Sequence, residues 1–188
     1  MKRKIILNFF NIMINKNKAT IKETFLNAYQ NYKNKNYEEA KTICHKILSI
    51  DPNHFDSIIL LANLAASHKN FKETKQLLLK ANELQTDNLS VLNNLGTTCK
   101  ELRELDEAID YYEKVIQINP DNAAANYNLG LIYHERKKLN EAKDCLIRAT
   151  DSHPNFALSF FALGNVYVDL KKYENAVSNY QKAITINP

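Results

Sequence analysis

The chain has 188 residues, of which 45% are hydrophobic and 24% are charged, and its formal net charge is +4. These proportions are typical of a water-soluble globular chain, and they exclude collagen-like and low-complexity sequences. Gly and Pro number only 3 and 4, which favours an almost entirely helical protein.

The first twenty residues, MKRKIILNFFNIMINKNKAT, begin with basic side chains and are mostly apolar over residues 5–14. A signal peptide opens in a similar way, but Asn8 and Asn11 interrupt the apolar run and no small-x-small cleavage site follows it. The run is also too short to span a bilayer. We favour an amphipathic helix that covers the exposed face of the helices that follow. The alternatives are a membrane-surface helix at residues 1–14 and a natural start at Met13.

From residue 21 onward the chain repeats with a period of 34 residues and without insertion, which indicates a stacked repeat array. Gly96, Gly130 and Gly164 are one period apart. The same spacing separates the members of two further columns, which are Ala40, Thr74, Ala108, Ala142 and Ala176, and Pro52, Thr86, Pro120, Pro154 and Pro188. We therefore divide the chain into an extension and five repeats, at residues 1–20, 21–54, 55–88, 89–122, 123–156 and 157–188.

Each repeat is predicted to hold two helices. In residues 89–102 the apolar residues recur at steps of three and four, which is one face of a helix. A second run follows the break RELD, and Asp106 and Glu107 at its start are expected to supply a capping oxygen and favourable charge. Pro120 then ends the second helix because it lacks an N–H group. The predicted fold is all-α, with about ten repeat helices plus an N-terminal helix.

Small residues interrupt the first helix of several repeats. Gly96, Gly130 and Gly164 lie in mid-helix, where Gly costs about 1 kcal/mol relative to Ala. We expect this cost to be tolerated because another backbone comes close there, with Ala142 and its equivalents offering a shallow spot on the second helix. Large residues such as Tyr112 are expected to fill the space beside the contact.

These columns resemble the tetratricopeptide repeat (TPR) family. The last repeat matches the family pattern throughout, at Leu163, Gly164, Tyr167, Ala176, Tyr180, Ala183 and Pro188. Other repeats depart from the pattern at Asn27, Thr74, Cys99 and Leu146. The resemblance implies a right-handed α-α superhelix, a TPR solenoid, in which the first helix of each repeat lines a concave groove.

If the first helices line a groove, their inward side chains are the candidate partner-binding residues. By register these are Tyr29, Asn63, Asn93, Asn94, Thr97, Lys100, Tyr127, Asn128, Leu131, His134, Phe161 and Asn165. The same registers also hold Glu101, Glu135 and Asp169. Amide and aromatic side chains suit an extended peptide, whose backbone they hydrogen-bond and whose side chains they contact.

Two precedents within the TPR family were weighed. Chaperone-binding TPR modules clamp a terminal carboxylate with Lys and Asn, but the Lys positions here hold Ile59 and Ala124, so we reject that interpretation. The TPR arrays of O-linked N-acetylglucosamine transferases carry an asparagine ladder, and Asn94 and Asn128 match two of its positions. Because Asn is common at this position in TPR repeats generally, we prefer the generic interpretation.

No catalytic, metal or cofactor motif stands out. Cys44, Cys99 and Cys145 occupy core columns without CxxC spacing, so buried reduced thiols are expected, which favours a reducing compartment. The excess of positive charge lies in residues 1–54, with ten Lys or Arg against four acids. We do not expect nucleic-acid binding, because the later repeats mix signs and no basic column is expected to repeat with the period.

The predicted function is therefore that of a cytoplasmic, non-enzymatic scaffold that binds a peptide or partner protein. The alternative is a substrate-recruiting arm of a larger glycosyltransferase. No capping helix follows Pro188, which leaves Val177, Tyr180 and Ile184 uncovered. We expect a longer natural chain, or end-to-end self-association through this last repeat.

Overall fold

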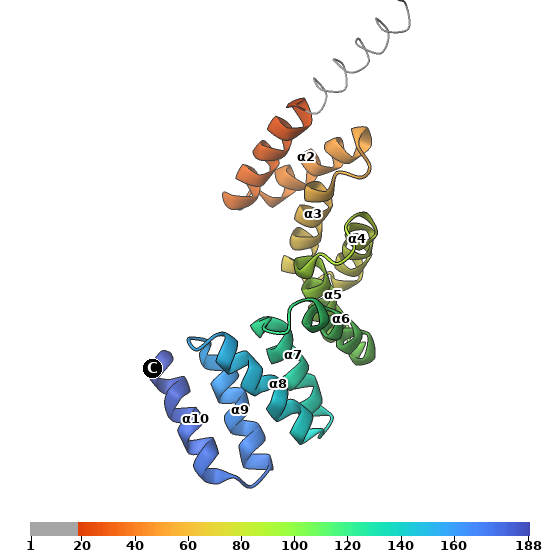
Figure 1. Ribbon diagram of the computed structural model, residues 1–188. Coiled ribbons are helices and arrows are strands. Elements are labelled where there is room, and N and C mark those ends of the chain that lie inside the picture. Colours follow the sequence, from red (N-terminus) through yellow and green to blue (C-terminus); the bar gives the residue numbers. More distant parts are fainter. Residues whose placement is uncertain (1–18) are drawn as a thin grey trace, which may run out of the picture. The chain divides into compact units, whose positions relative to one another are not determined.

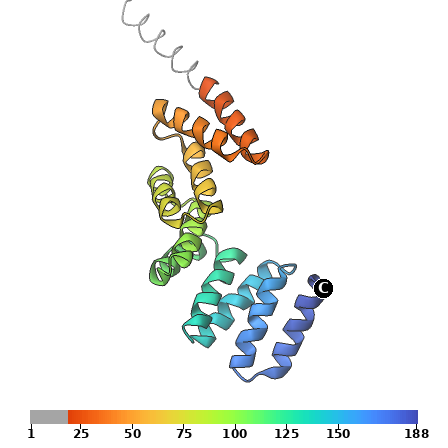
Figure 2. The same ribbon diagram turned by 180° about the vertical axis from the view of Figure 1, so that it is seen from behind.

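The computed structural model describes residues 19–188, and every regular element among them is a helix (Figures 1 and 2). The first helix described spans residues 19–33. The others are α2 (Tyr37–Ile50), α3 (Phe55–Ser67), α4 (Phe71–Leu84), α5 (Leu89–Glu101), α6 (Leu105–Ile118), α7 (Ala123–Glu135), α8 (Leu139–Ser152), α9 (Ala157–Asp169) and α10 (Tyr173–Ile186). The predicted all-α fold is confirmed. The predictions for residues 1–18, including a membrane-surface helix, lie outside the described residues.

The helices form two compact units. Unit 1 ends at Leu84, and unit 2 runs from Gln85 to Pro188, coloured green to blue in Figure 1. Within unit 2 each helix packs against the next one along the chain, and α7 also contacts both α5 and α9. The first helix of a repeat therefore packs against its own second helix and against the first helix of the next repeat.

The core of each unit is made of residues at recurring positions. In unit 1, Ala28 of the first described helix packs with Ala40 and Ile43 of α2. In unit 2, Tyr112 of α6 packs with Leu129 of α7, and all its atoms are buried. One helical pair cannot bury its own apolar face, so the core continues from pair to pair inside each unit.

Helix starts differ from the sequence prediction at α6. The side-chain oxygens of Asn88 and Asn122 accept backbone N–H groups at the starts of α5 and α7, as good N-caps do. At α6, in contrast, the N-cap residue is Glu104 and its side chain makes no capping hydrogen bond. The prediction of a capping oxygen from Asp106 or Glu107 was therefore wrong. Both residues lie inside the first turn, where their negative charge interacts favourably with the positive N-terminal end of the helix dipole.

Each turn between the two helices of a repeat holds a basic residue in the left-handed backbone region. These residues are Lys35, Lys69, Arg103, Lys137 and Lys171, with φ between 58° and 64°. At each of them the backbone closes the preceding helix with paired hydrogen bonds, such as Lys69 N to Ala66 O and Asn70 N to Ala65 O, both 2.9 Å. The expectation that no basic column repeats with the period was wrong, because these five residues are spaced by 34.

The nearest neighbour of each mid-helix glycine is a side chain of the second helix. A Cβ atom at Gly96 would lie 2.7 Å from the Tyr112 ring, and one at Gly164 would lie 2.5 Å from the Tyr180 ring. At Gly130 the nearest atom would be the Leu146 Cγ atom, at 2.7 Å. A large side chain of the second helix therefore uses the space that a Cβ atom would need. At Gly130 the Ala142 carbonyl oxygen would also lie 3.3 Å from that atom, so the predicted approach of another backbone is present there.

Candidate partner-binding surface

The structure divides the predicted groove residues between the two units. Tyr29 and Asn63 belong to unit 1, and the other ten belong to unit 2. We use the name first-helix face for one set of side chains of unit 2. It consists of Asn94, Thr97, Lys100, Asn128, Leu131, His134 and Asn165, together with the charged residues Glu101, Arg103, Glu135, Lys137 and Asp169.

Polar contacts link the first helices of successive repeats across this face. Lys100 on α5 donates from its Nζ atom to the Asn128 Oδ1 atom on α7, at 2.7 Å. One repeat further on, the Nε2 atom of His134 lies 3.0 Å from the Asp169 Oδ2 atom, which also accepts a hydrogen bond from Lys137. Groups predicted to be free for a ligand are therefore partly engaged in holding α5, α7 and α9 together.

The protonation of the linked groups follows from these surroundings. Burial lowers the pKa of the Lys100 ammonium group, against the opposing influence of the Glu101 carboxylate. The hydrogen bonds from Lys137 and His134 lower the pKa of the Asp169 carboxyl group. Asn128 also donates from its Nδ2 atom to the Ala124 carbonyl, so its amide orientation is held from both ends.

A second set of contacts ties the first helix of a repeat to its own second helix. The Thr97 hydroxyl lies 3.0 Å from the Tyr112 hydroxyl, and the Tyr180 hydroxyl donates to the Asn165 Oδ1 atom at 2.7 Å. Both pairs occupy the same two positions of the repeat. Burial raises the pKa of Tyr112 to about 12, so this hydroxyl stays protonated at neutral pH.

A hollow of about 410 Å³ opens on the first-helix face between α5 and α7. It is lined by Lys100, Glu101, Arg103, Leu131, Ile132 and Glu135. Arg103 donates to the Glu135 carboxylate at 2.8 Å across its rim. Leu131 and Ile132 therefore give the hollow an apolar wall, and charged groups of both signs surround it.

Of the remaining predicted residues of unit 2, Asn93 and Tyr127 are the less available ones. Asn93 donates to the Leu89 carbonyl at 3.0 Å, and its buried Oδ1 atom has no partner among the described residues. The Tyr127 ring packs edge-on against Phe156 at 4.9 Å, and burial raises its pKa. Phe161 is half exposed and lies against the Tyr180 ring at 5.6 Å.

In unit 1 the two predicted residues lie on different helices. Tyr29 is 43% exposed and stacks at 6.4 Å on Tyr32, with the Lys33 ammonium group 4.9 Å from its ring centre. Asn63 is exposed on α3. Among the residues described, no hydrogen bond or ring contact joins these two side chains, so unit 1 offers an aromatic surface and a separate amide.

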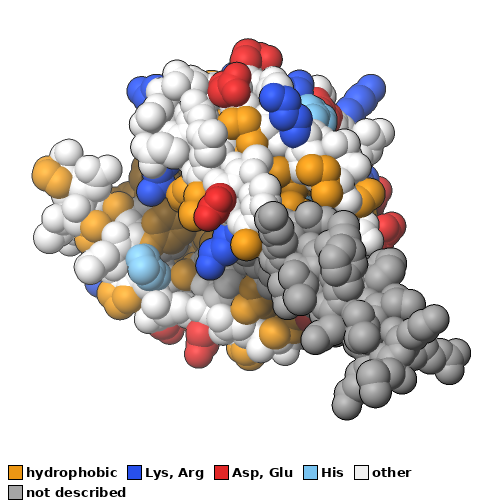
Figure 3. All heavy atoms as spheres, turned by 90° about the horizontal axis from the view of Figure 1, so that it is seen from above, with side chains coloured by type: hydrophobic (Ala, Val, Ile, Leu, Met, Phe, Trp, Pro, Cys, Tyr) orange, Lys and Arg blue, Asp and Glu red, His pale blue; other side chains and the backbone are white. Residues whose placement is uncertain are grey.

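Sequence reasoning missed two residues of this surface, Arg103 and Lys137. Both lie in turns, outside the helical positions from which the groove residues were predicted. Both donate hydrogen bonds to carboxylates of the following repeat. Their signal in the sequence is the basic column with the 34-residue spacing. On the face visible in Figure 3, Lys and Arg side chains are interspersed with Asp and Glu side chains.

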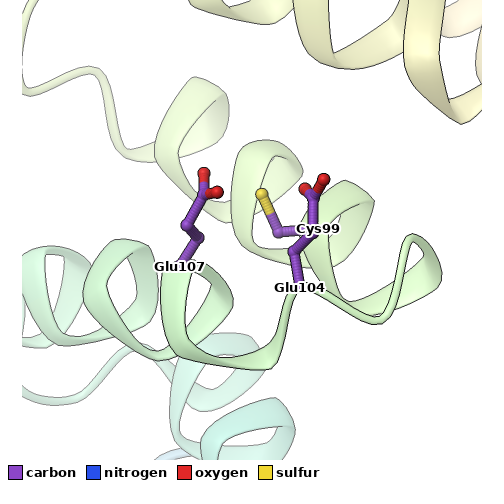
Figure 4. A group of neighbouring side chains, drawn as sticks. All are labelled: Cys99, Glu104 and Glu107. Atoms are coloured by element: carbon purple, nitrogen blue, oxygen red, sulfur yellow. The ribbon is translucent and has the colours of Figure 1, made fainter.

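Cys44, Cys99 and Cys145 form no disulfide bond within the described residues. Cys44 and Cys99 are buried, whereas Cys145 is half-buried rather than fully buried as predicted. Cys99 lies beside Glu104 and Glu107, with one ligand atom of each within 4.8 Å of the others (Figure 4). A structural zinc ion takes four ligands. Because this group has three and Glu107 is exposed, we assign no metal to it.

Over residues 19–188, no helix has the length and apolar character that crossing a bilayer requires.

Comparison with known proteins identifies the repeat. Tetratricopeptide repeat family models match residues 101–159 and 157–188, and the model for subunit 3 of the anaphase-promoting complex, or cyclosome, matches residues 33–115. A search of curated proteins found no match.

Solved structures share the fold at low sequence identity. YrrB, described as a TPR protein with an unusual peptide-binding site, aligns with a TM-score of 0.75 and 23% identity over 95% of this chain and 92% of its own. PilF of Pseudomonas aeruginosa aligns with a TM-score of 0.81 and 22% identity over 92% and 79%. MamA from Desulfovibrio magneticus RS-1 aligns with a TM-score of 0.80 and 17% identity over 88% and 94%. The helical pairs, their 34-residue period and these matches agree, and the chain is a tetratricopeptide repeat protein.

Proposed function

We propose that the chain is a protein-interaction scaffold, and that the first-helix face of unit 2 binds an extended segment of a partner protein. The observation that carries the proposal is the hollow of about 410 Å³ between α5 and α7, which has an apolar wall at Leu131 and polar side chains around it. A hollow of this kind takes one side chain of a peptide while the polar groups meet its backbone.

The contacts of the face favour backbone recognition. Asn94 is half-buried on α5, and the amide of Asn128 is held in one orientation by Lys100 and Ala124. An amide held in one orientation, as that of Asn128 is, loses little freedom on binding, so its hydrogen bonds contribute more to affinity. The description of YrrB as a peptide-binding TPR protein supports a peptide as the ligand class.

The mixed charges of the first-helix face bear on the composition of the peptide that it would bind. Arg103 is paired with Glu135, and Asp169 is paired with both Lys137 and His134. A face whose charges are already balanced does not select a strongly acidic or basic peptide. No observation on the described residues favours the alternative of a transferase arm.

A peptide selection tests the proposal. Dodecapeptides selected from a random displayed library on the immobilised full chain are expected to bind the unmodified chain and to lose binding to Leu131→Glu. Asn94→Ala together with Asn128→Ala is expected to weaken the same peptides about thirtyfold, because the two lost hydrogen bonds cost about 1 kcal/mol each.

The matched control is Asn175→Ala, which removes an exposed amide from α10, away from the first-helix face. It should leave affinity unchanged, and thermal unfolding should show that all variants stay folded. Selected peptides that bind Leu131→Glu as well as they bind the unmodified chain would overturn the proposal.

A further inference from the structure

Unit 1 has a hollow in its surface, where α2, α3 and the start of α4 meet. Its volume is about 230 Å³. Leu61, Leu64 and Ala65 of α3 line the hollow and are buried, so they form its floor. Glu38 and Asn70 also line it but are exposed, so they lie at its mouth. Closely packed helices leave few spaces of this size, and the register of the repeat explains this one.

Ala65 stands in a column that holds a tyrosine in the last two repeats. Two periods after Ala65 the residue is Tyr133, and three periods after it the residue is Tyr167. The Lys138 ammonium group lies 5.6 Å from the centre of the Tyr133 ring. The equivalent of Lys138 in unit 1 is Asn70, which lines the hollow. The hollow thus corresponds to the place of a tyrosine ring in the later repeat.

Cys99, one period after Ala65, indicates the same direction. Figure 4 shows its side chain between those of Glu104 and Glu107, with one ligand atom of each within 4.8 Å of the others. The equivalents of these two acids in unit 1 both line the hollow, and they are Asn70 and Glu73. A side chain longer than that of Ala65 would therefore enter the hollow, and the alanine leaves it open.

The walls of the hollow are held in place by contacts within unit 1. The Tyr37 and His68 rings meet edge-on at 5.9 Å, and the His68 Nδ1 atom lies 2.8 Å from the Leu64 carbonyl oxygen. The Asn70 Nδ2 atom donates to the Glu73 Oε2 atom at 2.6 Å. A ligand would therefore meet walls that are already ordered, which reduces the entropy lost on binding.

The size and lining of the hollow suit an aromatic ring. An apolar cavity of about 150 Å³ holds benzene, and this hollow is larger. The Tyr37 and His68 rings offer a third ring edge and face contacts. A side chain that enters through the mouth brings its tip to Leu61, Leu64 and Ala65, whose side chains form no hydrogen bonds. A phenylalanine ring fits this floor, whereas a tyrosine hydroxyl would lose water without gaining a partner.

From the register and the lining, we propose that this hollow binds the phenylalanine side chain of a partner protein. The ring takes the space equivalent to the one that Tyr133 fills in unit 2, and the partner's main chain stays at the mouth. There Glu38 offers an acceptor and Lys41 a donor for main-chain N–H and C=O groups. The site belongs to unit 1, so it stands or fails independently of the first-helix face of unit 2.

The probe is N-acetyl-phenylalanine amide, which presents the ring on a short main chain. Titration into the full chain, labelled at Leu and Ala methyl groups, is expected to shift the NMR signals of Leu61, Leu64 and Ala65 through the ring current. Burial of one such side chain supports a dissociation constant on the order of 10 mM. Leu129 is the internal control, because it is the equivalent of Leu61 in the core beside Tyr133, and its signals should not shift.

Two further amides test the choice of ring. N-acetyl-leucine amide is expected to bind at least threefold more weakly, because leucine makes no ring contacts with Tyr37 and His68. N-acetyl-tyrosine amide is also expected to bind at least threefold more weakly, because its hydroxyl would be buried against the apolar floor.

Filling the hollow from inside tests its location. Ala65→Tyr restores the residue of the later repeats and should abolish the shifts of Leu61 and Leu64. Ala65→Met, a more adaptable filling residue, should weaken binding at least fivefold. Gln76→Tyr is the matched control, because it adds the same ring to an exposed position of α4 that does not line the hollow. It should leave the dissociation constant unchanged, and all three variants should keep the helical circular dichroism of the parent.

Three outcomes would overturn the proposal. One is the absence of saturable shifts at Leu61 and Leu64, and another is equal binding by Ala65→Tyr and Gln76→Tyr. The third concerns a chain with both Phe9→Ala and Phe10→Ala, which is expected to bind the probe as the parent does. Binding at least tenfold tighter than that of the parent would show that the chain's own phenylalanine occupies the hollow.

Discussion

At the scale of single residues, the glycine column shows that a large side chain of the second helix packs where a glycine lacks one. Sequence periodicity predicted a tight contact at Gly96, Gly130 and Gly164. The contact partner was not predictable from the period alone, because the second helix offers a small residue and a large one within a few positions. The structure shows that the large one, such as Tyr112, fills the space.

Alanine substitutions separate this steric effect from helix propensity. Gly96→Ala is expected to lower the free energy of unfolding by about 1–2 kcal/mol, because the clash with the buried Tyr112 ring outweighs the propensity gain of about 1 kcal/mol. Gly164→Ala should cost less, because Tyr180 is only partly buried and its ring has more room to move than that of Tyr112. Urea unfolding followed by circular dichroism measures both, and a stabilised Gly96→Ala would refute the argument.

The thiols give a second prediction at this scale. Burial raises the pKa of Cys44 and of Cys145 to about 11, so little thiolate forms at pH 8 in the folded chain. A disulfide reagent that releases a coloured thiol should therefore label the native protein much more slowly than the protein in 6 M guanidinium chloride, on the order of a hundredfold. Equal rates in the two conditions would contradict the burial of these side chains.

At the scale of elements, helices were predictable and their ends were less so. Apolar steps of three and four identified the helical runs, and Pro120 follows the end of α6 as expected. The turns were harder to predict, because a helix that ends in the left-handed region usually has Gly or Asn at that position. Here Lys or Arg occupies that position in every repeat, where its positive charge interacts favourably with the negative C-terminal end of the helix dipole.

The basic turn residues carry a conformational cost that can be measured. Lys69 has φ of 58°, a region that costs a residue with a side chain about 1 kcal/mol. Lys69→Gly should therefore raise the free energy of unfolding by about 0.5–1 kcal/mol. Lys69→Ala is the control, because alanine keeps the backbone strain and should not raise the free energy of unfolding. Thermal unfolding of both variants measures the difference.

The candidate site was predicted in part at this scale. Register placed Lys100, Asn128 and His134 on first helices that pack together, but it did not show that these groups already bond to other repeats. Such contacts depend on side-chain reach between helices 28 to 35 residues apart in sequence. They connect neighbouring repeats, so the face is both a candidate binding surface and part of what holds unit 2 together.

At the scale of the whole molecule, periodicity predicted the architecture because each repeat is stabilised by its neighbours. The division into two compact units was not predicted, since the same 34-residue spacing runs through Leu84 and Gln85 without a break. Stability in such an array is close to a sum of contributions from repeats and from the contacts between adjacent repeats. Damage to one interface should consequently remain local.

Hydrogen exchange in Leu146→Ala tests this claim most directly. Leu146 on α8 is fully buried in a core shared with α9, so its truncation should cost about 2–5 kcal/mol. We expect amide protection to fall most in α7, α8 and α9, and progressively less in helices separated from α8 by more repeats. An equal loss of protection in every helix, from α2 to α10, would show a single shared core and contradict the account.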